Sequence, residues 1–495
     1  MHASSHKKPS PVLQAKSKKP ANPVVPGPGM IKVWEEDPED GVLTTAAKPD
    51  PAKAPLAFRF PQPAPTPSDD TSSAAFRYWT AAEALRRGAD FWAPQVPAGQ
   101  WQLGPELPVL LDEGLDLNAY YDRQALNFFH GPSPDVPGGI VFSGESPDIV
   151  CHEMGHAILD SLKPQLFDTA NLETAAFHES FGDMSAILSA LQLESLRKSI
   201  VTETHGHLYS NSRLSRLAEQ LGTALRAQRP DRVDPDCLRN AVNSFTYVDP
   251  TTLPPIAPAV QLSSEPHYFS RIFTGAFLEI LAGMLTASAA DPAAPTPDEL
   301  QTVSKQMREI LVTGIVNAPV VSNFFAEVAA AMVQACVAVN PAYRPILSGV
   351  FVRRAILSLQ TAANMHALQT SAAAAAPMAM LAGNLALAQL DKVALPAGHY
   401  GLAEPLIVQT PSQPRRIVAM AARMDSRQSE PVSAVSAATH FVDALFTSGH
   451  VDYDTFGVAG ATLDAGRRLK THRIVRKDGA LELKRLLFDC GLCQH

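Results

Sequence analysis

One segment, residues 146–164, narrows the choice of fold more than any other, and it reads SPDIVCHEMGHAILDSLKP. Its first three residues, Ser146, Pro147 and Asp148, are typical of a helix start, with a hydroxyl N-cap, a proline at the first helical position and an acid in the first turn. Lys163 and Pro164 end the pattern, because proline cannot continue a helix. The segment therefore predicts a helix between Ser146 and Lys163.

The same segment contains the pattern HExxH, formed by His152, Glu153 and His156. Residues four apart on a helix are separated by about 40° and about 6 Å, so both imidazoles project from one face. Two histidines in this geometry can bind one Zn²⁺, and the glutamate between them can reach a metal-bound water without being a ligand. The pattern predicts a metal site on this helix.

A further acidic pair, Glu179 and Asp183, lies in the next helical pattern, which covers about 171–193. Two helices joined by a short loop can pack antiparallel, which would bring Glu179 to the same metal as a third ligand. Asp183 lies one turn later on the same face. It can accept a hydrogen bond from the free nitrogen of a ligand histidine, a contact that such sites need.

The 495 residues divide by composition into four parts. Residues 1–70 are rich in proline, lysine and alanine and predict an unstructured tail, in which the acidic run at 34–41 is solvated. The other three parts are an α+β region at 71–157 that ends in the metal helix, a helical region at 158–389, and an α+β extension at 390–495. Short strands are expected at 107–111, 117–122, 125–129 and 138–143, helices at 211–226, 269–288, 297–315, 322–338 and 346–364, and a hairpin around Asp478–Gly479.

The composition excludes several classes of protein. A net charge of −8 argues against a nucleic-acid-coating role, and no apolar run is long enough to predict a membrane span. The basic N-terminus lacks the apolar stretch of a signal peptide, so a cytoplasmic location is expected, with leaderless export left open. Five cysteines do not form a disulfide framework, and Cys490 and Cys493 resemble half a zinc site or a redox pair.

HExxH followed by a helix bearing E-x-x-x-D resembles the thermolysin-like metallopeptidases, or gluzincins, over residues 107–285. The resemblance implies an α+β fold with a sheet-bearing N-terminal lobe and a mainly helical C-terminal lobe, extended here by residues 390–495. It also implies zinc held by His152, His156 and Glu179, Glu153 as the general base, and Asp183 as the hydrogen-bonding partner of a ligand histidine.

Other positions match the substrate-binding parts of that family. Asn118 and Ala119 resemble the edge strand that hydrogen-bonds the extended substrate backbone. Leu238 and Arg239 resemble the segment that lines the specificity pocket, and Ile149 matches another wall of that pocket. An apolar lining implies a preference for bulky apolar residues just after the scissile bond.

His267 matches the histidine that stabilises the oxyanion in the family, but its surroundings differ. The position that usually carries an orienting aspartate is Leu262, so Glu265 or another acid would have to substitute. The family tyrosine between the metal helix and the third ligand is missing, and Tyr268 is a candidate replacement. His178 stands where relatives have asparagine.

These residues together predict a zinc-dependent endopeptidase that acts on a peptide or protein. Most of the acidic cluster that binds paired calcium ions in relatives is absent, with only Asp148 at a matching position, so zinc is expected and calcium is doubtful. One alternative is a catalytically impaired, peptidase-like binding or scaffold protein. Another is a zinc hydrolase of a different class such as an aminopeptidase, although no G-x-M-E-N pattern is present to anchor a free amine.

Overall fold

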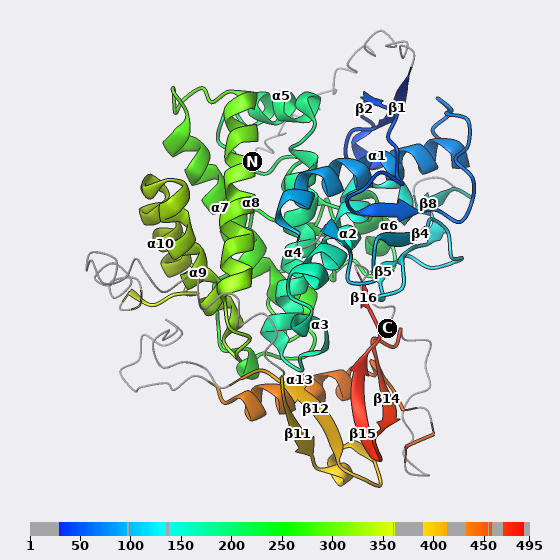
Figure 1. Ribbon diagram of the computed structural model, residues 1–495, viewed down its shortest axis with the longest axis vertical. Coiled ribbons are helices and arrows are strands. Elements are labelled where there is room, and N and C mark those ends of the chain that lie inside the picture. The colour runs from blue at the N-terminus through cyan, green and yellow to red at the C-terminus, as the bar shows by residue number, and fades with distance from the viewer. Residues whose placement is uncertain are drawn as a thin grey trace, which may run out of the picture.

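A computed structural model describes residues 29–96, 99–134, 138–359, 361, 390–412, 432–453, 455–457 and 469–489. Helices and several small sheets surround one large apolar core, so the α+β class is confirmed (Figure 1). The α-helices are α1 (Ala74–Trp92), α2 (Pro147–Leu162), α3 (Gln165–Asp168), α4 (Leu172–Ala190), α5 (Glu194–Glu203), α6 (Glu219–Arg226), α7 (Pro266–Ser288), α8 (Pro297–Asn317), α9 (Phe324–Val339), α10 (Arg344–Arg353) and α13 (Ala434–Thr447).

The strands are short, and one two-residue strand near the C-terminus joins a sheet formed early in the chain. They are β1 (Met30–Trp34), β2 (Leu43–Ala47), β3 (Ala57–Arg59), β4 (Glu106–Leu110), β5 (Ala119–Tyr121), β6 (Leu126–Phe128), β7 (His130–Pro132), β8 (Ile140–Phe142), β9 (Arg216–Leu217), β10 (Arg239–Asn240), β11 (Asp391–Leu395), β12 (Leu406–Thr410), β13 (Val451–Asp452), β14 (His472–Lys477), β15 (Ala480–Arg485) and β16 (Phe488–Asp489).

The predicted unstructured tail is too long, because residues 30–59 contain β1, β2 and β3. β1 and β2 form an antiparallel hairpin, and the alternation in MIKVW buries Ile31 and Val33 against Tyr78 and Trp79 of α1. This alternation was the available signal, and the surrounding prolines hid it. Residues 1–28 lie outside the described residues.

The first three acids of the run at 34–41 are buried rather than solvated, whereas Glu39 is exposed. Glu35, Glu36 and Asp37 are each at most 3% exposed. The Arg213 guanidinium donates to Glu35 at 3.1 Å, and Asp37 accepts a hydrogen bond from the Ser146 hydroxyl at 2.7 Å. Ser146 is therefore the N-cap residue of α2 by position, as predicted, but its hydroxyl anchors the N-terminal hairpin instead of the helix backbone.

β5 and β6 lie in a five-stranded sheet whose order is β16-β5-β6-β4-β3. β3, β4 and β6 are parallel, while β5 runs antiparallel to β6 and to β16. The predicted strands at 107–111, 117–122, 125–129 and 138–143 correspond to β4, β5, β6 and β8. α2 packs against β5, so this sheet is directly behind the metal helix.

α2 and α4 cross closely because small residues meet at the crossing. A Cβ added to Gly155 of α2 would lie 2.9 Å from the Cα of Gly182 on α4. A Cβ on Gly182 would lie within 2.7 Å of three atoms of the His152 ring. The absence of side chains at these two glycines therefore allows α4 to lie directly against the imidazole of His152.

Two predicted helices differ from the structure. The helix expected at 211–226 begins only at Glu219, because the backbone turns at Ser212–Ser215 and Ala218 adopts a left-handed φ of 52°. The helix expected at 346–364 is α10, and its regular part ends at Arg353 before Ala355, which also has a positive φ of 56°.

α7 is the one helix among the described residues with the length and hydropathy of a membrane span. Of its most apolar window, 78% is buried inside the protein. α7 packs against α4, and the Ser180 hydroxyl donates to the Ser270 carbonyl at 2.9 Å across that contact. Its apolar character is therefore that of a core helix.

The C-terminal part of the chain has a sheet of its own with the order β11-β12-β15-β14-β13, and α13 contacts β12 (Figure 1). The predicted hairpin is confirmed: β14 and β15 are antiparallel, and Asp478 and Gly479 both have positive φ. After β15 the chain leaves this sheet and reaches β5 as β16. Cys490 and Cys493 lie outside the described residues.

Candidate metal centre

The three predicted ligands come together at the crossing of α2 and α4. Nε2 of His152 lies 3.4 Å from Oε2 of Glu179, and Nε2 of His156 lies 3.9 Å from the same oxygen. The ligand atoms of the three residues all lie within 4.8 Å of one another, and all three side chains are buried. Glu153, between the two histidines on α2, is fully buried as well.

His152 is oriented by the acid predicted for this task. Its Nδ1 lies 3.1 Å from Oδ1 of Asp183. Arg239 donates to the same carboxylate oxygen at 2.9 Å, and the Thr274 hydroxyl donates to the other oxygen at 3.2 Å. Asp183 thus links the first ligand histidine to β10 and to α7.

His156 is oriented by a second imidazole. Its Nδ1 lies 3.4 Å from Nδ1 of His178, one residue before Glu179 on α4. Burial lowers the pKa of His178 well below its usual value, which keeps that ring neutral and able to accept a hydrogen bond. If Nδ1 of His156 carries the proton, its Nε2 lone pair faces the cluster.

The pKa values of the two carboxylates at the cluster, Glu179 and Asp183, lie below their usual values, so both carry the negative charge that favours a bound cation. Burial, together with the adjoining His152 and His267 rings, lowers the pKa of His156 to about 3, so this ring is neutral. Burial opposes ionisation of Asp183, but the Arg239 guanidinium and His152 hold its pKa at about 2. Burial likewise disfavours the charged form of His152, and the neighbouring carboxylates Asp183 and Glu179 outweigh it and raise its pKa to about 9.

The donor set fits zinc. The two Nε2 atoms of His152 and His156 and Oε2 of Glu179 are buried, and none makes a well-aligned hydrogen bond to any described group. Buried polar atoms without such partners are costly, and a metal ion would satisfy all three. If a tetrahedral ion were held by these two imidazoles and one carboxylate, one ligand position would remain for a water molecule or a substrate.

Comparison with protein families and with curated proteins finds no match to either. We therefore infer the function of this chain from the residues of the site itself.

His267 adjoins the ligand cluster from the first turn of α7. Its Nε2 lies 3.2 Å from Oε2 of Glu179, and its Nδ1 lies 2.6 Å from Oε1 of Glu265. Glu265, which was expected as a possible orienting acid, is thus in contact with the His267 ring. Although burial opposes it, the two carboxylates raise the pKa of His267 well above its usual value. Tyr268, by contrast, donates its hydroxyl to the Arg232 carbonyl at 2.9 Å.

The predicted substrate-binding residues lie in three different places. Leu238 and Arg239 line a small pocket together with His267 and Tyr268. Ile149 is buried on α2 one turn before His152, outside the residues that line this pocket. Asn118 and Ala119 lie at the start of β5, where the Asn118 carbonyl accepts a hydrogen bond from Ser143 at 2.7 Å.

Asp148, the one match to a calcium position, lies in a different acidic group. Burial raises its pKa well above the usual value, and the neighbouring carboxylates Glu36, Asp37 and Glu219 raise it further. This buried acidic group was not predicted, because Glu36 and Asp37 belong to residues 1–70, which were expected to form an unstructured tail.

Proposed function

We propose that this protein is a zinc-dependent endopeptidase with a thermolysin-like two-lobed arrangement. The observation that carries the proposal is the convergence of three buried ligand atoms, from His152, His156 and Glu179, within 4.8 Å. Glu153 in the same helix supports hydrolysis over mere metal storage, because a storage site has no use for a buried carboxylate between the two candidate ligand histidines.

Zinc bound here would polarise a substrate carbonyl and lower the pKa of a water molecule. Glu153 would accept the proton of the attacking water and pass it to the leaving amine. His267 would donate a hydrogen bond from Nε2 to the carbonyl oxygen as negative charge develops there, and Glu265 on Nδ1 would keep the ring in the required orientation.

The substrate would bind as an extended strand along β5, with its main chain paired to the sheet edge. Leu238 and the pocket beside Arg239 would receive the side chain that follows the scissile bond, which favours apolar residues there. Calcium forms no part of the proposal.

Three substitutions test this function. Glu153→Gln should retain about one zinc per chain and lose roughly 10²–10⁴-fold in hydrolysis of a blocked apolar peptide. His267→Ala should retain zinc and lose roughly 10²–10³-fold, whereas His156→Ala should lose the metal. Zinc content is measured by elemental analysis and turnover by chelator-sensitive peptide cleavage. Full zinc content in His156→Ala, or equal turnover by wild type and Glu153→Gln, would contradict the proposal.

A peptidase-like binding protein is the second candidate, and one observation favours it. The edge of β5 that a substrate would use is already paired with β16 of the same chain. If wild type and Glu153→Gln are equally inactive on a broad peptide library while zinc remains bound, this candidate replaces the first.

A further inference from the structure

β16 lies where an extended peptide would meet the site. It pairs antiparallel with β5, so that Phe488 faces Tyr121 and Asp489 faces Tyr120. β16 is thereby an edge strand of this sheet, and its neighbour β5 packs against α2. The pairing is main-chain β-augmentation, the mode by which sheet edges capture extended peptides of many sequences.

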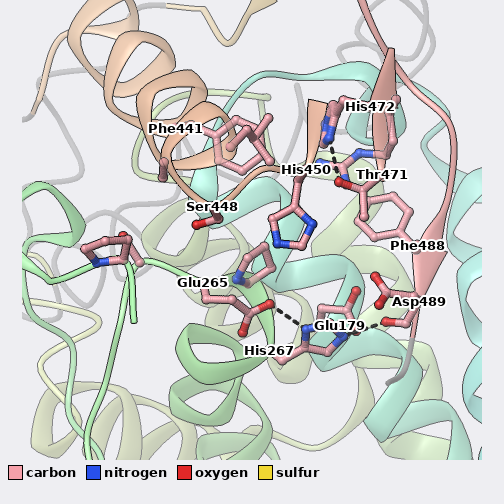
Figure 2. Close-up of a pocket in the computed structure, with 16 residues that line it drawn as sticks. Glu179, Glu265, His267, Phe441, Ser448, His450, Thr471, His472, Phe488 and Asp489 are labelled. Carbon is pink, nitrogen blue, oxygen red and sulfur yellow. Dashed lines mark hydrogen bonds and ion pairs between the residues drawn. The ribbon is translucent and has the colours of Figure 1, made fainter. Parts of the chain in front are cut away.

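The two residues of β16 contact the candidate metal centre directly. The Phe488 ring stacks on His178 with centroids 4.1 Å apart and on His156 with centroids 5.1 Å apart. The Asp489 carbonyl accepts a hydrogen bond from Nε2 of His267 at 2.5 Å (Figure 2). A peptide carbonyl of this chain therefore uses the same nitrogen that we assign to the carbonyl of a substrate.

The wall opposite His267 belongs to the C-terminal part of the chain. Figure 2 shows Glu179, Glu265 and His267 on one side of a pocket, and Phe441, His450 and His472 across from them. Arg485, the last residue of β15, donates to the Phe167 carbonyl at 2.9 Å, which sets β16 against the site.

The attachment of this C-terminal part does not depend on β16. The Ala170 amide donates to the Gln409 carbonyl at 2.8 Å, and the Ser412 amide donates to the Val320 carbonyl at 2.8 Å. A two-residue strand contributes few main-chain hydrogen bonds, so it can leave its edge at far lower cost than global unfolding.

We propose that β16 is a substrate mimic built into the chain, which docks on the edge of β5 in place of an external peptide and keeps the site closed until it leaves. The proposal depends on the proposed function for its catalytic consequence but not for the docking itself. Docking in cis reduces the fraction of molecules that can bind a peptide, so the apparent affinity for that peptide falls by the same factor.

Peptide binding in the zinc-loaded Glu153→Gln background tests the docking without turnover. The probe is a fluorescent blocked peptide with the sequence of residues 484–489, KRLLFD, and its partner probe has alanine in place of phenylalanine. Deletion of residues 488–495 should strengthen KRLLFD binding by about tenfold or more over the intact chain, measured by anisotropy. The alanine probe should bind more weakly than KRLLFD.

Two control chains test whether the gain in peptide binding comes from the loss of Phe488 and Asp489. Deletion of residues 490–495 alone keeps Phe488 and Asp489 and should leave binding as weak as in the intact chain. Phe456→Ala removes a half-buried phenylalanine from the same C-terminal part without touching the metal centre and should also change nothing. Phe488→Ala should open the edge, and it replaces the deletion if thermal unfolding shows that the shortened chain does not fold.

The outcomes separate this inference from the proposed function. Two results together support both the docking of β16 and the proposed peptidase. The chains without residues 488–495 or with Phe488→Ala bind the probe tightly in the Glu153→Gln background, and the same chains with Glu153 retained cleave peptides about tenfold faster than wild type. Tight binding without cleavage contradicts the peptidase and leaves the docking intact. Equal binding by intact and opened chains, or an equal gain from deleting 490–495 alone, overturns the assignment of β16, even where cleavage is observed.

Discussion

At the scale of single residues, the two ligand histidines are held by different chemistry. A carboxylate that is itself bonded to Arg239 fixes His152, whereas a neutral imidazole faces His156. In the tautomer of His178 whose Nδ1 carries no proton, this neutral ring accepts the hydrogen bond from Nδ1 of His156 and adds no charge to the cluster.

His178 therefore allows a matched pair of substitutions. His178→Asn keeps a hydrogen-bond acceptor near Nδ1 of His156 and should retain zinc affinity within a few fold. His178→Leu removes the acceptor and should weaken zinc binding by roughly 10–100-fold. Competition with a chromophoric chelator measures both. Equal loss in the two variants would mean that His178 acts only by packing against Phe488.

The structure brings the predicted ligand residues together where spacing alone determines their position. His152 and His156 share a helix face because they are four residues apart, and Glu179 reaches them because a short connection joins α2 to α4. His178 was not predicted as the partner of His156, because nothing local distinguishes an acceptor imidazole from a packed one. The signal was its position directly before Glu179.

At the scale of elements, α2 and α4 lie close together because two glycines without side chains meet at their crossing. Glycines at 155 and 182 allow the two helices to approach until the His152 ring lies over the α4 backbone. The sequence contained both glycines, but only the crossing geometry gives them a role.

Gly182→Ala should therefore displace His152. The added methyl would lie 2.5 Å from Cε1 of that ring, so the ring or the helix must move, and zinc affinity should fall by at least about tenfold. Isothermal titration of the metal-free protein measures the change.

Gly349→Ala on α10 is the matched control. Its added methyl meets only the flexible end of Arg353 at 3.3 Å, so zinc affinity should not change and the helix should gain a little stability. Unchanged zinc binding in Gly182→Ala would show that α2 and α4 separate without disturbing the site.

At the scale of the whole molecule, one buried acid joins three distant segments. Glu173 on α4 accepts hydrogen bonds from the Tyr247 hydroxyl and from the Phe325 amide at the start of α9, both at 2.7 Å. Burial outweighs these two contacts and raises the pKa of Glu173 to about 8. The folded protein therefore holds this proton more tightly than the unfolded chain does.

The sign of the pH dependence follows. The free energy of unfolding should receive its full contribution from Glu173 below about pH 4, the unfolded pKa, and lose it as pH rises toward 8. Glu173→Gln has no such proton, so its unfolding free energy should fall less between pH 5 and 8, by on the order of a few kcal/mol. Denaturant unfolding at both pH values measures this, with exposed Glu404→Gln as control. An equal fall in unfolding free energy between pH 5 and 8 in wild type and Glu173→Gln would contradict this prediction.

Long-range pairing is what the sequence could not disclose. Phe488 was predicted only as the end of a hairpin over 471–488, and the folded chain brings it and Asp489 to Tyr121 and Tyr120. The N-terminal hairpin was missed for a related reason, since Glu35 is acceptable in a core only because Arg213 meets it there. Local periodicity carries no information about partners so far away along the chain.

The late position of β16 has a consequence for synthesis on the ribosome. His152, His156, Glu179 and His267 all precede Asp489, and the last of them does so by 222 residues. At about 5–20 residues per second, those residues take roughly 10–45 s to translate. During that interval a nascent chain carries these four residues of the candidate site with the β5 edge uncovered. A growing polypeptide of this protein is thus most open to foreign strands before its own last strand has been made.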